Sequence, residues 1–516
     1  MNAQKFIDLY KEKEMKFWKK EGRVTKIKLF QLINFLTLIL GICKVRIYKT
    51  TYLAVKTNNI VELVGIEEVS QKVINYVKSN FPHDYCVINR TDILDALIEK
   101  SITFYNDKIL NHLTIYNIPL LIDTKSTSEI AFDNDIIKIN KSGHLLISYD
   151  DYKNPLLKKQ IIGRNFIEVK QKCQGGFSKL VWNLSNHSVK GFKVLCSILG
   201  YLMHRYKDPA NPKMIILIDQ VIAELETSMG GSGKSLLISA LSHIRNLVEV
   251  SGKKFQSNQR FAFQRVDIWT DIVLVNDASK NENLENWYNI LADGFMMERK
   301  YEKEQFIPYD YSFKVAMTTN HMIKQPEGNS SERRKHEVEV SDYYGKDLTP
   351  EQDFGHILFN DWNASEWNQF DNFMVFCLEY YLQFGLITPP IINILKRKLI
   401  SEVGVALIEF MDEKIQSGVT KFHKKDTYDE FIKGGYVDRK YIPQRNSFTR
   451  KLKKYFEYKE LNHTETPSDS KKYFELITND KIKEFTTKSL KDCDVKYTLV
   501  DTDKKLKQFE NQLKTH

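Results

Sequence analysis

The stretch that decides the fold of this chain is Gly230-Gly231-Ser232-Gly233-Lys234-Ser235. Its small residues let the backbone curl so that successive N–H groups point into one concavity, which suits a polyphosphate. Lys234 can then reach the β- and γ-phosphates, and the Ser235 hydroxyl can join the shell of a Mg²⁺ ion. The full pattern has a glycine where this chain has Ser228. We interpret the stretch as a slightly degenerate Walker A loop for ATP and Mg²⁺; a glycine-rich turn that only opens a helix is the alternative.

The segments around this loop predict an α/β fold. An unbroken apolar run at 214–218 precedes the loop, and a helix is expected from 234 to about 247. Further apolar runs of strand length follow at 272–275 and 315–317. Continuous apolar strands that alternate with helices are typical of a parallel sheet covered on both faces. The sequence therefore predicts a P-loop ATPase core.

A second element of the expected site ends the apolar run 272–275. Asn276 and Asp277 follow that run, and Asp277 comes 43 residues after Lys234 (277 − 234). A carboxylate at the carboxyl end of a strand can hold Mg²⁺ or its water and orient an attacking water. The pair predicts a Walker B strand, although buried strands that end in aspartate are common.

Two more elements follow in order. The run 315–317 leads into Thr318, Thr319 and Asn320, and an asparagine there can sense the γ-phosphate; a simple strand-end turn is the alternative. Arg333 and Arg334 lie in a basic cluster after a polar loop. A guanidinium inserted from a neighbouring subunit would stabilise charge on the transferring phosphoryl group, and a solvated basic loop is the alternative.

The order of these four motifs resembles that of the superfamily 3 helicases. The kinship is with ATPase modules of primase-helicases from phages, plasmids and large DNA viruses, including the poxvirus type. The resembling stretches lie within 212–345: GGSGKS at 230–235, VLVND at 273–277, LADGFMMERKYEKEQFIP at 291–308, TTN at 318–320 and ERR at 332–334. The resemblance implies an AAA+-like ATPase that forms a ring, expected to be hexameric, with ATP bound between subunits.

The resemblance also implies a β-hairpin that grips DNA in the channel of the ring. In this sequence the hairpin maps onto Arg299, Lys300 and Lys303 as expected DNA contacts. An exposed charged hairpin without that role is the alternative.

The sequence departs from the resembling family at one position. The family ends its Walker B strand with two acidic residues, whereas this chain has Asn276 before Asp277. Either Asn276 supports the Mg²⁺ shell as a neutral ligand or Asp277 performs both tasks. We expect hydrolysis to survive, with Ser235, Asn276 and Asp277 as the metal-side residues.

Composition sets the wider limits. At 516 residues with 42% hydrophobic side chains the chain is expected to fold into several domains. The net charge of +10 is compatible with nucleic acid. Six dispersed cysteines form no CxxC pair, so a reducing interior is expected rather than a zinc site or a disulfide framework. The apolar run 29–42 is too short to cross a bilayer and is interpreted as a buried helix.

Five segments are expected along the chain. They are an N-terminal α+β adaptor or oligomerisation domain (1–165), a helical linker or collar (166–211), the ATPase domain (212–345), a helical segment (346–420) and a basic winged-helix-like domain with a tail (421–516). A primase in the first segment would need clustered carboxylates for two metal ions. The candidates, Asp123, Asp150 and Asp151, have no convincing partner motif, which favours a non-catalytic domain.

The last segment is basic. Between residues 421 and 460 there are 12 Lys and Arg against 6 Asp and Glu. A helix with Ser447 near its N-cap is expected, with an apolar stripe at Phe448, Leu452, Tyr455 and Phe456. Two strands are expected at 457–461 and 472–477.

The basic face of that helix supplies the second set of expected DNA contacts. Arg450, Lys451 and Lys454 would meet phosphate backbone, and a solvated basic helix on a packing domain is the alternative.

Together these features lead to one expected function. The chain would be a ring-forming, Mg²⁺-ATP-dependent replicative DNA helicase of a phage or mobile element, acting on single-stranded or forked DNA. Its partners would be further copies of itself and a primase or replication initiator, with no membrane, in the cytoplasm of a bacterium or an infected host cell. Two alternatives stay open: a bifunctional primase-helicase, and an ATP-dependent assembly or packaging factor that binds nucleic acid without unwinding it.

Overall fold

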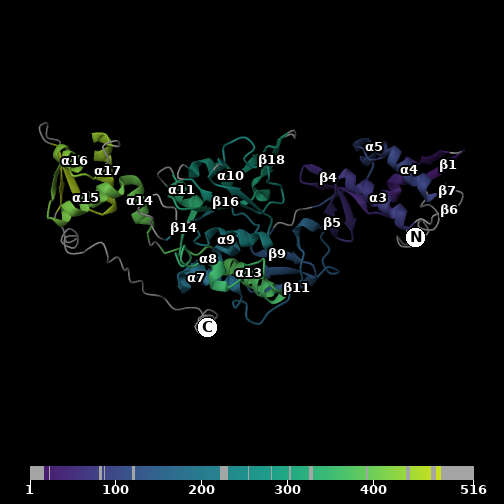
Figure 1. Ribbon diagram of the computed structural model, residues 1–516, viewed down its shortest axis with the longest axis horizontal. Coiled ribbons are helices and arrows are strands. Elements are labelled where there is room, and N and C mark those ends of the chain that lie inside the picture. Colours follow the sequence, from purple (N-terminus) through teal and green to yellow (C-terminus); the bar gives the residue numbers. More distant parts are fainter. Residues whose placement is uncertain are drawn as a thin grey trace. The chain divides into compact units, whose positions relative to one another are not determined.

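Two compact units make up this computed structural model (Figure 1). The first comprises 1–168, 204–206 and 243–246, and the second comprises 169–203, 207–242 and 247–516. Within them the structure describes residues 17–22, 24–80, 84–85, 88–118, 123–220, 231–253, 255–279, 282–300, 304–324, 329–390, 393–436, 442–466 and 472–477. The finer division into five segments stays a prediction.

The first unit contains two mixed sheets and several helices. One sheet has the strand order β12-β5-β4-β3-β8 and the other has the order β11-β10-β9-β13. The strands of the first sheet are Leu156–Leu157, Ile60–Leu63, Thr50–Thr57, Ile42–Ile47 and Ile115–Asn117 in that order, and those of the second are Gly143–Ser148, Asp135–Asn140, Thr127–Phe132 and Ile161–Ile162. Hairpin β1–β2 (Trp18–Glu21, Val24–Ile27), the short pair β6–β7 (Asp84–Tyr85, Ile88–Asn89), 3₁₀ turn η1 (Lys158–Gln160) and helices α2 (Leu29–Leu38), α3 (Ile66–Asn80), α4 (Arg90–Glu99), α5 (Ser101–Phe104) and α6 (Asp107–Leu110) complete the unit.

Turns set the ends of several of these strands and of helix α2, and the sequence patterns alone do not locate those turns. The β-rich segments 44–52 and 130–139 each contribute to two strands, because turns at Tyr48–Lys49 and Asp133–Asn134 fold each segment back on itself. The helix expected over 29–42 stops at Leu38. Gly41 then adopts a φ of +66°, where an added Cβ would lie 2.5 Å from the Lys56 carbonyl oxygen, and strand β3 begins at Ile42. No helix in the described ranges has the length and apolar content needed to cross a membrane.

A five-stranded parallel sheet is the centre of the second unit. Its strand order is β15-β16-β19-β14-β20. In that order the strands are Leu247–Ser251, Ile272–Ala278, Lys314–Thr319, Met214–Asp219 and Lys335–Val340. The three apolar runs predicted as strands are β14, β16 and β19, and their core residues are buried. The prediction of a mixed α/β fold with a parallel sheet is confirmed.

Strand β15 was not predicted. Helix α9 spans Lys234–Ser239, a 3₁₀ turn η2 follows at Ala240–His243, and the chain enters β15 at Leu247. The expected helix therefore ends too late. Its apolar residues Leu237, Ile238 and Leu241 are buried whether the backbone is α-helical or 3₁₀, so their spacing could not locate the end.

Helices α7 (Gly176–Leu184), α8 (Val189–Met203) and α13 (Ala364–Phe384) pack together in the second unit (Figure 1). Aromatic side chains fill the core between these helices. Phe370 and Phe373 of α13 are buried and their rings contact Phe177 at centroid distances of 5.1 and 5.9 Å. Shorter elements of the unit are η3 (Leu284–Trp287), α10 (Tyr288–Ala292), β17 (Gly294–Met297), β18 (Gln305–Pro308), η4 (Tyr309–Tyr311), α11 (Asn329–Arg334) and α12 (Pro350–Phe354).

The C-terminal part of the second unit joins four helices to a small antiparallel sheet. Along the chain the elements are α14 (Ile394–Val403), α15 (Val405–Gln416), β21 (Lys421–His423), α16 (Lys424–Lys433), α17 (Arg445–Tyr458), β22 (His463–Thr466) and β23 (Tyr473–Leu476). The predicted apolar stripe of α17 is buried. Two predictions are wrong: the helix starts after Gln444, so Ser447 is not its N-cap, and residues 457–461 end the helix instead of forming a strand.

Gly200 allows the close contact between α8 and α13. A Cβ built on it would lie 2.2 Å from the Cys377 carbonyl oxygen and 2.5 Å from Tyr381 Cβ. We expect Gly200→Ala to push the helices apart and destabilise the unit by about 1–3 kcal/mol, as measured by thermal or urea unfolding. The control is Gly345→Ala, where an added Cβ meets nothing within 4 Å. Equal stability of both variants would contradict this packing.

Candidate nucleotide site

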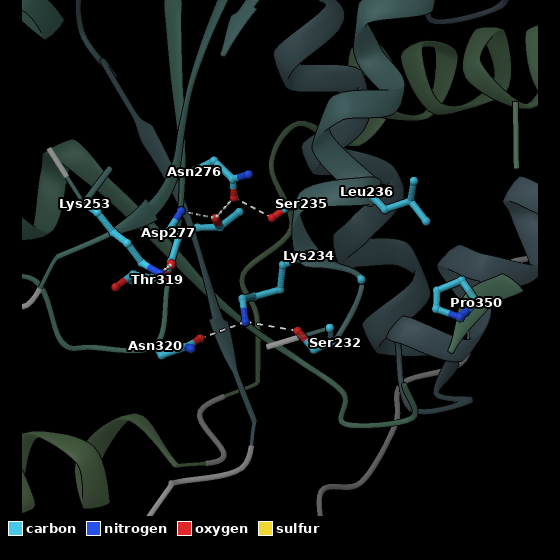
Figure 2. Close-up of a pocket in the computed structure, with 13 residues that line it drawn as sticks. Ser232, Lys234, Ser235, Leu236, Lys253, Asn276, Asp277, Thr319, Asn320 and Pro350 are labelled. Atoms are coloured by element: carbon cyan, nitrogen blue, oxygen red, sulfur yellow. Dashed lines mark hydrogen bonds and ion pairs between the residues drawn. The ribbon is translucent and has the colours of Figure 1, made fainter. Parts of the chain in front are cut away.

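A pocket of about 520 Å³ lies at the carboxyl ends of strands β16 and β19, beside the start of α9. Figure 2 shows its lining. The lining residues are Gly231, Ser232, Gly233, Lys234, Ser235, Leu236, Lys253, Asn276, Asp277, Thr318, Thr319, Asn320 and Pro350. Ligands of open parallel sheets bind at this edge. The structure thus brings together three motifs that are far apart in the sequence.

The glycine-rich loop enters the pocket with an unusual backbone. Gly231 has a φ of +100° and Gly233 has a φ of +84°, values that a residue with a Cβ adopts only with strain. A Cβ on Gly233 would also lie 3.2 Å from Leu184 Cδ2. Gly230 lies outside the described residues. Positive φ values alternating with helical ones are the geometry in which backbone N–H groups form an anion-binding concavity.

The Lys234 ammonium is the buried charge of the pocket. Its Nζ lies 3.0 Å from Ser232 Oγ and 3.0 Å from Asn320 Oδ1 (Figure 2), and it forms an ion pair with Asp219. Burial lowers the pKa of Lys234, and the Asp219 carboxylate opposes that shift. An ammonium held at this depth is an attractive partner for phosphate oxygens, because little water screens it.

A β-bulge positions the two residues that end β16. The pairing register between β16 and β19 shifts between Val275 and Ala278, where Asn276 and Asp277 lie. Bulges next to active sites turn side chains away from the regular alternation of a strand. Gly252 permits this one, because its Cβ would lie 2.5 Å from Ala278 Cα.

The Asn276 carboxamide is hydrogen-bonded on both sides. Its Oδ1 accepts from Ser235 Oγ at 2.5 Å and from Thr318 Oγ1 at 2.8 Å (Figure 2). Its Nδ2 donates to Glu249 Oε1 at 2.7 Å. Asn276, which stands where the resembling family has an acid, is therefore in contact with the Ser235 hydroxyl, and its role on the metal side stays a prediction.

Asp277 lies at the open side of the pocket. Its φ of +58° is rare for a residue other than glycine, and its N–H donates to Thr318 Oγ1 at 2.9 Å. Its carboxylate lies 3.0 Å from Lys253 Nζ and is half exposed. Strained backbone in a pocket is a mark of functional sites. The oxygens of Ser235, Asn276 and Asp277 are the hard donors that Mg²⁺ prefers, so the residues fit such an ion.

The expected arginines lie away from this pocket. They end α11, and the next residue, Lys335, is aligned with Met214 at the amino end of β14. The pocket lies at the carboxyl edge of the sheet. The two ends of a strand as long as β14 are roughly 16 Å apart. Arg333 is exposed, and the Arg334 guanidinium stacks 4.5 Å from the centroid of the Tyr288 ring. Both arginines could reach such a pocket only in another copy of the chain.

The expected DNA-gripping segment is an antiparallel hairpin of β17 and β18. Arg299 donates to the carbonyl oxygens of Gln264 and Val266, at 3.1 and 2.7 Å, and pairs with Asp267. Lys300 is exposed, and Lys303 lies outside the described residues.

The basic residues of α17 have different surroundings. Arg450 is exposed, Lys451 is partly buried, and Lys454 forms an ion pair of 3.4 Å with Glu402. Arg450 is therefore the residue of this group that the structure presents most openly to solvent.

The acidic candidates of a primase occupy structural positions. Asp123 is buried and accepts hydrogen bonds from Ser128 Oγ at 2.5 Å, from the Glu129 N–H at 3.0 Å and from the Arg205 N–H at 2.7 Å. Asp151 accepts from Ser148 Oγ at 2.8 Å. No group of three potential metal-ligating side chains occurs among the described residues.

Sequence reasoning missed four residues in or beside the site: Asp219, Glu249, Lys253 and Thr318. Asp219 carries a signal that could have been used, since it follows the apolar run 214–218 in the same way that Asp277 follows its own strand. Glu249 lies within strand β15 and Lys253 follows it, and because that strand was not predicted, the sequence gave no clue to their neighbours.

Comparisons with known proteins add little to this geometry. No family profile and no curated protein matches the chain. Among solved structures, the apo A form of the NrS-1 C-terminal region is 12% identical with a TM-score of 0.39, covering 89% of this chain and 100% of that one. A structure of Drosophila ORC bound to DNA is 11% identical with a TM-score of 0.16, covering 63% and 94%. Scores this low do not establish a shared fold, and identities this low transfer no function.

The ion pair between Asp219 and Lys234 generates a pH prediction. Because the Asp219 carboxylate holds up the pKa of Lys234, Asp219→Asn lowers that pKa further, and the ammonium is lost at a lower pH. We measure the affinity for a nucleoside triphosphate by titration at a series of increasing pH values. As the pH rises, we expect the affinity of Asp219→Asn to begin to fall at a lower pH than that of the wild type. Asp219→Glu, which keeps the carboxylate, is the control. Superimposable pH profiles would show that Asp219 does not act on Lys234.

Proposed function

We propose that this chain is a Mg²⁺-dependent ATPase that acts on DNA as a ring-forming helicase of the superfamily 3 type. The observation that carries the proposal is the convergence of Lys234, Ser235, Asn276, Asp277 and Asn320 in one pocket. These residues come from three motifs spread over 87 positions (234 to 320) of the chain.

Each side chain of the pocket has a task in this proposal. The loop N–H groups and the Lys234 ammonium bind phosphate oxygens, and Asn320, whose Oδ1 lies 3.0 Å from Lys234 Nζ, stands where it can respond to them. Ser235 and Asp277 hold Mg²⁺, which neutralises phosphate charge when bound. The Asp277 carboxylate faces the open side and can orient a water.

The placement of the arginines supports a ring. Because Arg333 and Arg334 lie at the amino edge of the sheet, one subunit alone lacks a guanidinium from this pair at its own pocket. Assembly of copies around DNA would supply it from a neighbour.

The catalytic assignment predicts the effect of two substitutions. We expect Lys234→Ala and Asp277→Asn each to lower steady-state ATP hydrolysis by on the order of a hundredfold, because each removes a charge directed at the phosphates or the water. Glu285→Ala, an exposed residue outside the pocket lining, is the control. Undiminished turnover in both pocket variants would sink the proposal.

Assays of the wild-type protein on DNA distinguish the helicase from the two alternative functions. Displacement of a strand from a forked duplex supports the helicase, whereas ATPase activity that single strands stimulate without displacement supports an assembly or packaging factor. Nucleotide incorporation on an unprimed single strand would support a primase-helicase.

The basic face of α17 predicts a difference between two DNA-binding variants. We expect Arg450→Ala to weaken DNA binding and to reduce the slope of log affinity against log salt by about 1, because one phosphate contact is lost. Lys454→Ala should have a smaller effect, since Glu402 already pairs with Lys454. Fluorescence anisotropy at several salt concentrations measures both. Identical slopes in the wild type and Arg450→Ala would exclude α17 from the DNA interface.

A further inference from the structure

Asn276 is the position at which this chain departs from an acidic metal-side residue, and its surroundings show how the departure is tolerated. Its side-chain amide could be placed in two orientations that differ by a flip. Two contacts in the structure constrain the choice, and the one with Glu249 decides it.

The first constraint comes from Thr318. The N–H of Asp277 can only donate, so Thr318 Oγ1 accepts from it at 2.9 Å. The single hydroxyl proton of Thr318 is then free to point at Asn276, where Oδ1 accepts it at 2.8 Å. This places the amide oxygen on the side of Thr318 and Ser235, but the hydroxyl keeps a second lone pair that could accept from an amide nitrogen, so the contact agrees with this orientation without fixing it.

The second constraint comes from Glu249. An ionised carboxylate can only accept, so the group 2.7 Å from Glu249 Oε1 must be the amide nitrogen of Asn276. Glu249 belongs to the neighbouring strand β15, whose register aligns Ser251 with Asn276. Its side chain is exposed, and its other oxygen, Oε2, makes a long contact of 3.4 Å with Ser239 Oγ of α9.

The consequence reaches Ser235. Asn276 Oδ1 accepts the Ser235 hydroxyl proton at 2.5 Å, so the lone pairs of Ser235 Oγ are directed away from Asn276. A hydroxyl whose proton is taken by a fixed acceptor is oriented to offer its lone pairs to a cation.

We propose that Glu249 is a positioning residue for the metal side of the site. Acting through Asn276, it orients the Ser235 hydroxyl toward Mg²⁺ and supplies, one hydrogen bond further out, the negative charge that Asn276 lacks. The metal-side acid of this chain is thus carried by the adjacent strand. This inference rests on the proposed nucleotide function, and it assigns Glu249 no contact with substrate.

Three variants test the arrangement. Glu249→Ala removes both the acceptor and the charge, and Glu249→Gln removes the charge in a side chain of the same size. Asn276→Asp places a second carboxylate beside Glu249, where the two repel each other. The double variant Asn276→Asp with Glu249→Gln moves the negative charge from β15 to β16.

The measurement is the Kd of a fluorescent ATP analogue, taken with Mg²⁺ and again with EDTA. We expect Glu249→Ala to weaken binding by about tenfold with Mg²⁺ and to leave binding in EDTA unchanged, as loss of an outer-shell partner does. Glu249→Gln should lose less than Glu249→Ala. Asn276→Asp alone should also lose Mg²⁺-dependent affinity, and the double variant should regain it, so that the two changes are not additive.

The outcomes separate this inference from the function on which it rests. Equal loss with Mg²⁺ and EDTA, or additive effects in the double variant, would show that Glu249 has a purely structural role and would overturn the inference. Glu285→Ala, which changes the net charge equally, should match the wild type. A wild-type chain that binds no nucleotide under either condition would overturn the proposed function together with the inference.

Discussion

The buried ammonium of Lys234 is the constraint to which the rest of the second unit is fitted. A charge at this depth needs a counter-charge and polar partners, and Asp219, Ser232 and Asn320 supply them from β14, the loop and β19. Breaking such a buried pair by removing one partner is costly, because the other charge is left uncompensated. The contacts of the Lys234 ammonium therefore hold the ends of β14 and β19 together with the start of α9.

The end of β14 is also bound to helix α14, through the backbone of Asp219. Arg397 of α14 donates to the Asp219 carbonyl oxygen and lies 3.6 Å from the Glu339 carboxylate of β20. Asn393 at the start of the same helix donates through its N–H to Glu339 Oε2 at 2.9 Å. Two cations and two anions thus alternate from the glycine-rich loop to α14. A change in what neutralises Lys234 alters the field at Arg397, because all four groups are largely buried and poorly screened.

The sequence predicted the parts of the site that depend on local pattern. Continuous apolar runs identified β14, β16 and β19, and the polar residues after them identified Asp277 and Asn320. It could not predict partners brought in by strand order. Glu249 reaches Asn276 because β15 lies beside β16, and Asp219 reaches Lys234 because the start of α9 lies beside the end of β14. Neither pairing leaves a trace in the spacing of residues along the chain.

The bulge at the end of β16 explains why these non-local partners matter. A regular strand would direct Asn276 and Asp277 to opposite faces of the sheet. The bulge instead brings the Asn276 amide to Ser235 and leaves Asp277 with a φ of +58°, a conformation that costs about 1–3 kcal/mol and persists only where its surroundings impose it. The imposing contacts are the hydrogen bond from the Asp277 N–H to Thr318 and that from the Gly252 N–H to the Asn276 carbonyl oxygen at 2.6 Å. The geometry at Ser235, Asn276 and Asp277 therefore depends on both neighbouring strands, and in the proposed metal site the carboxylate that Asn276 lacks comes from Glu249 of β15.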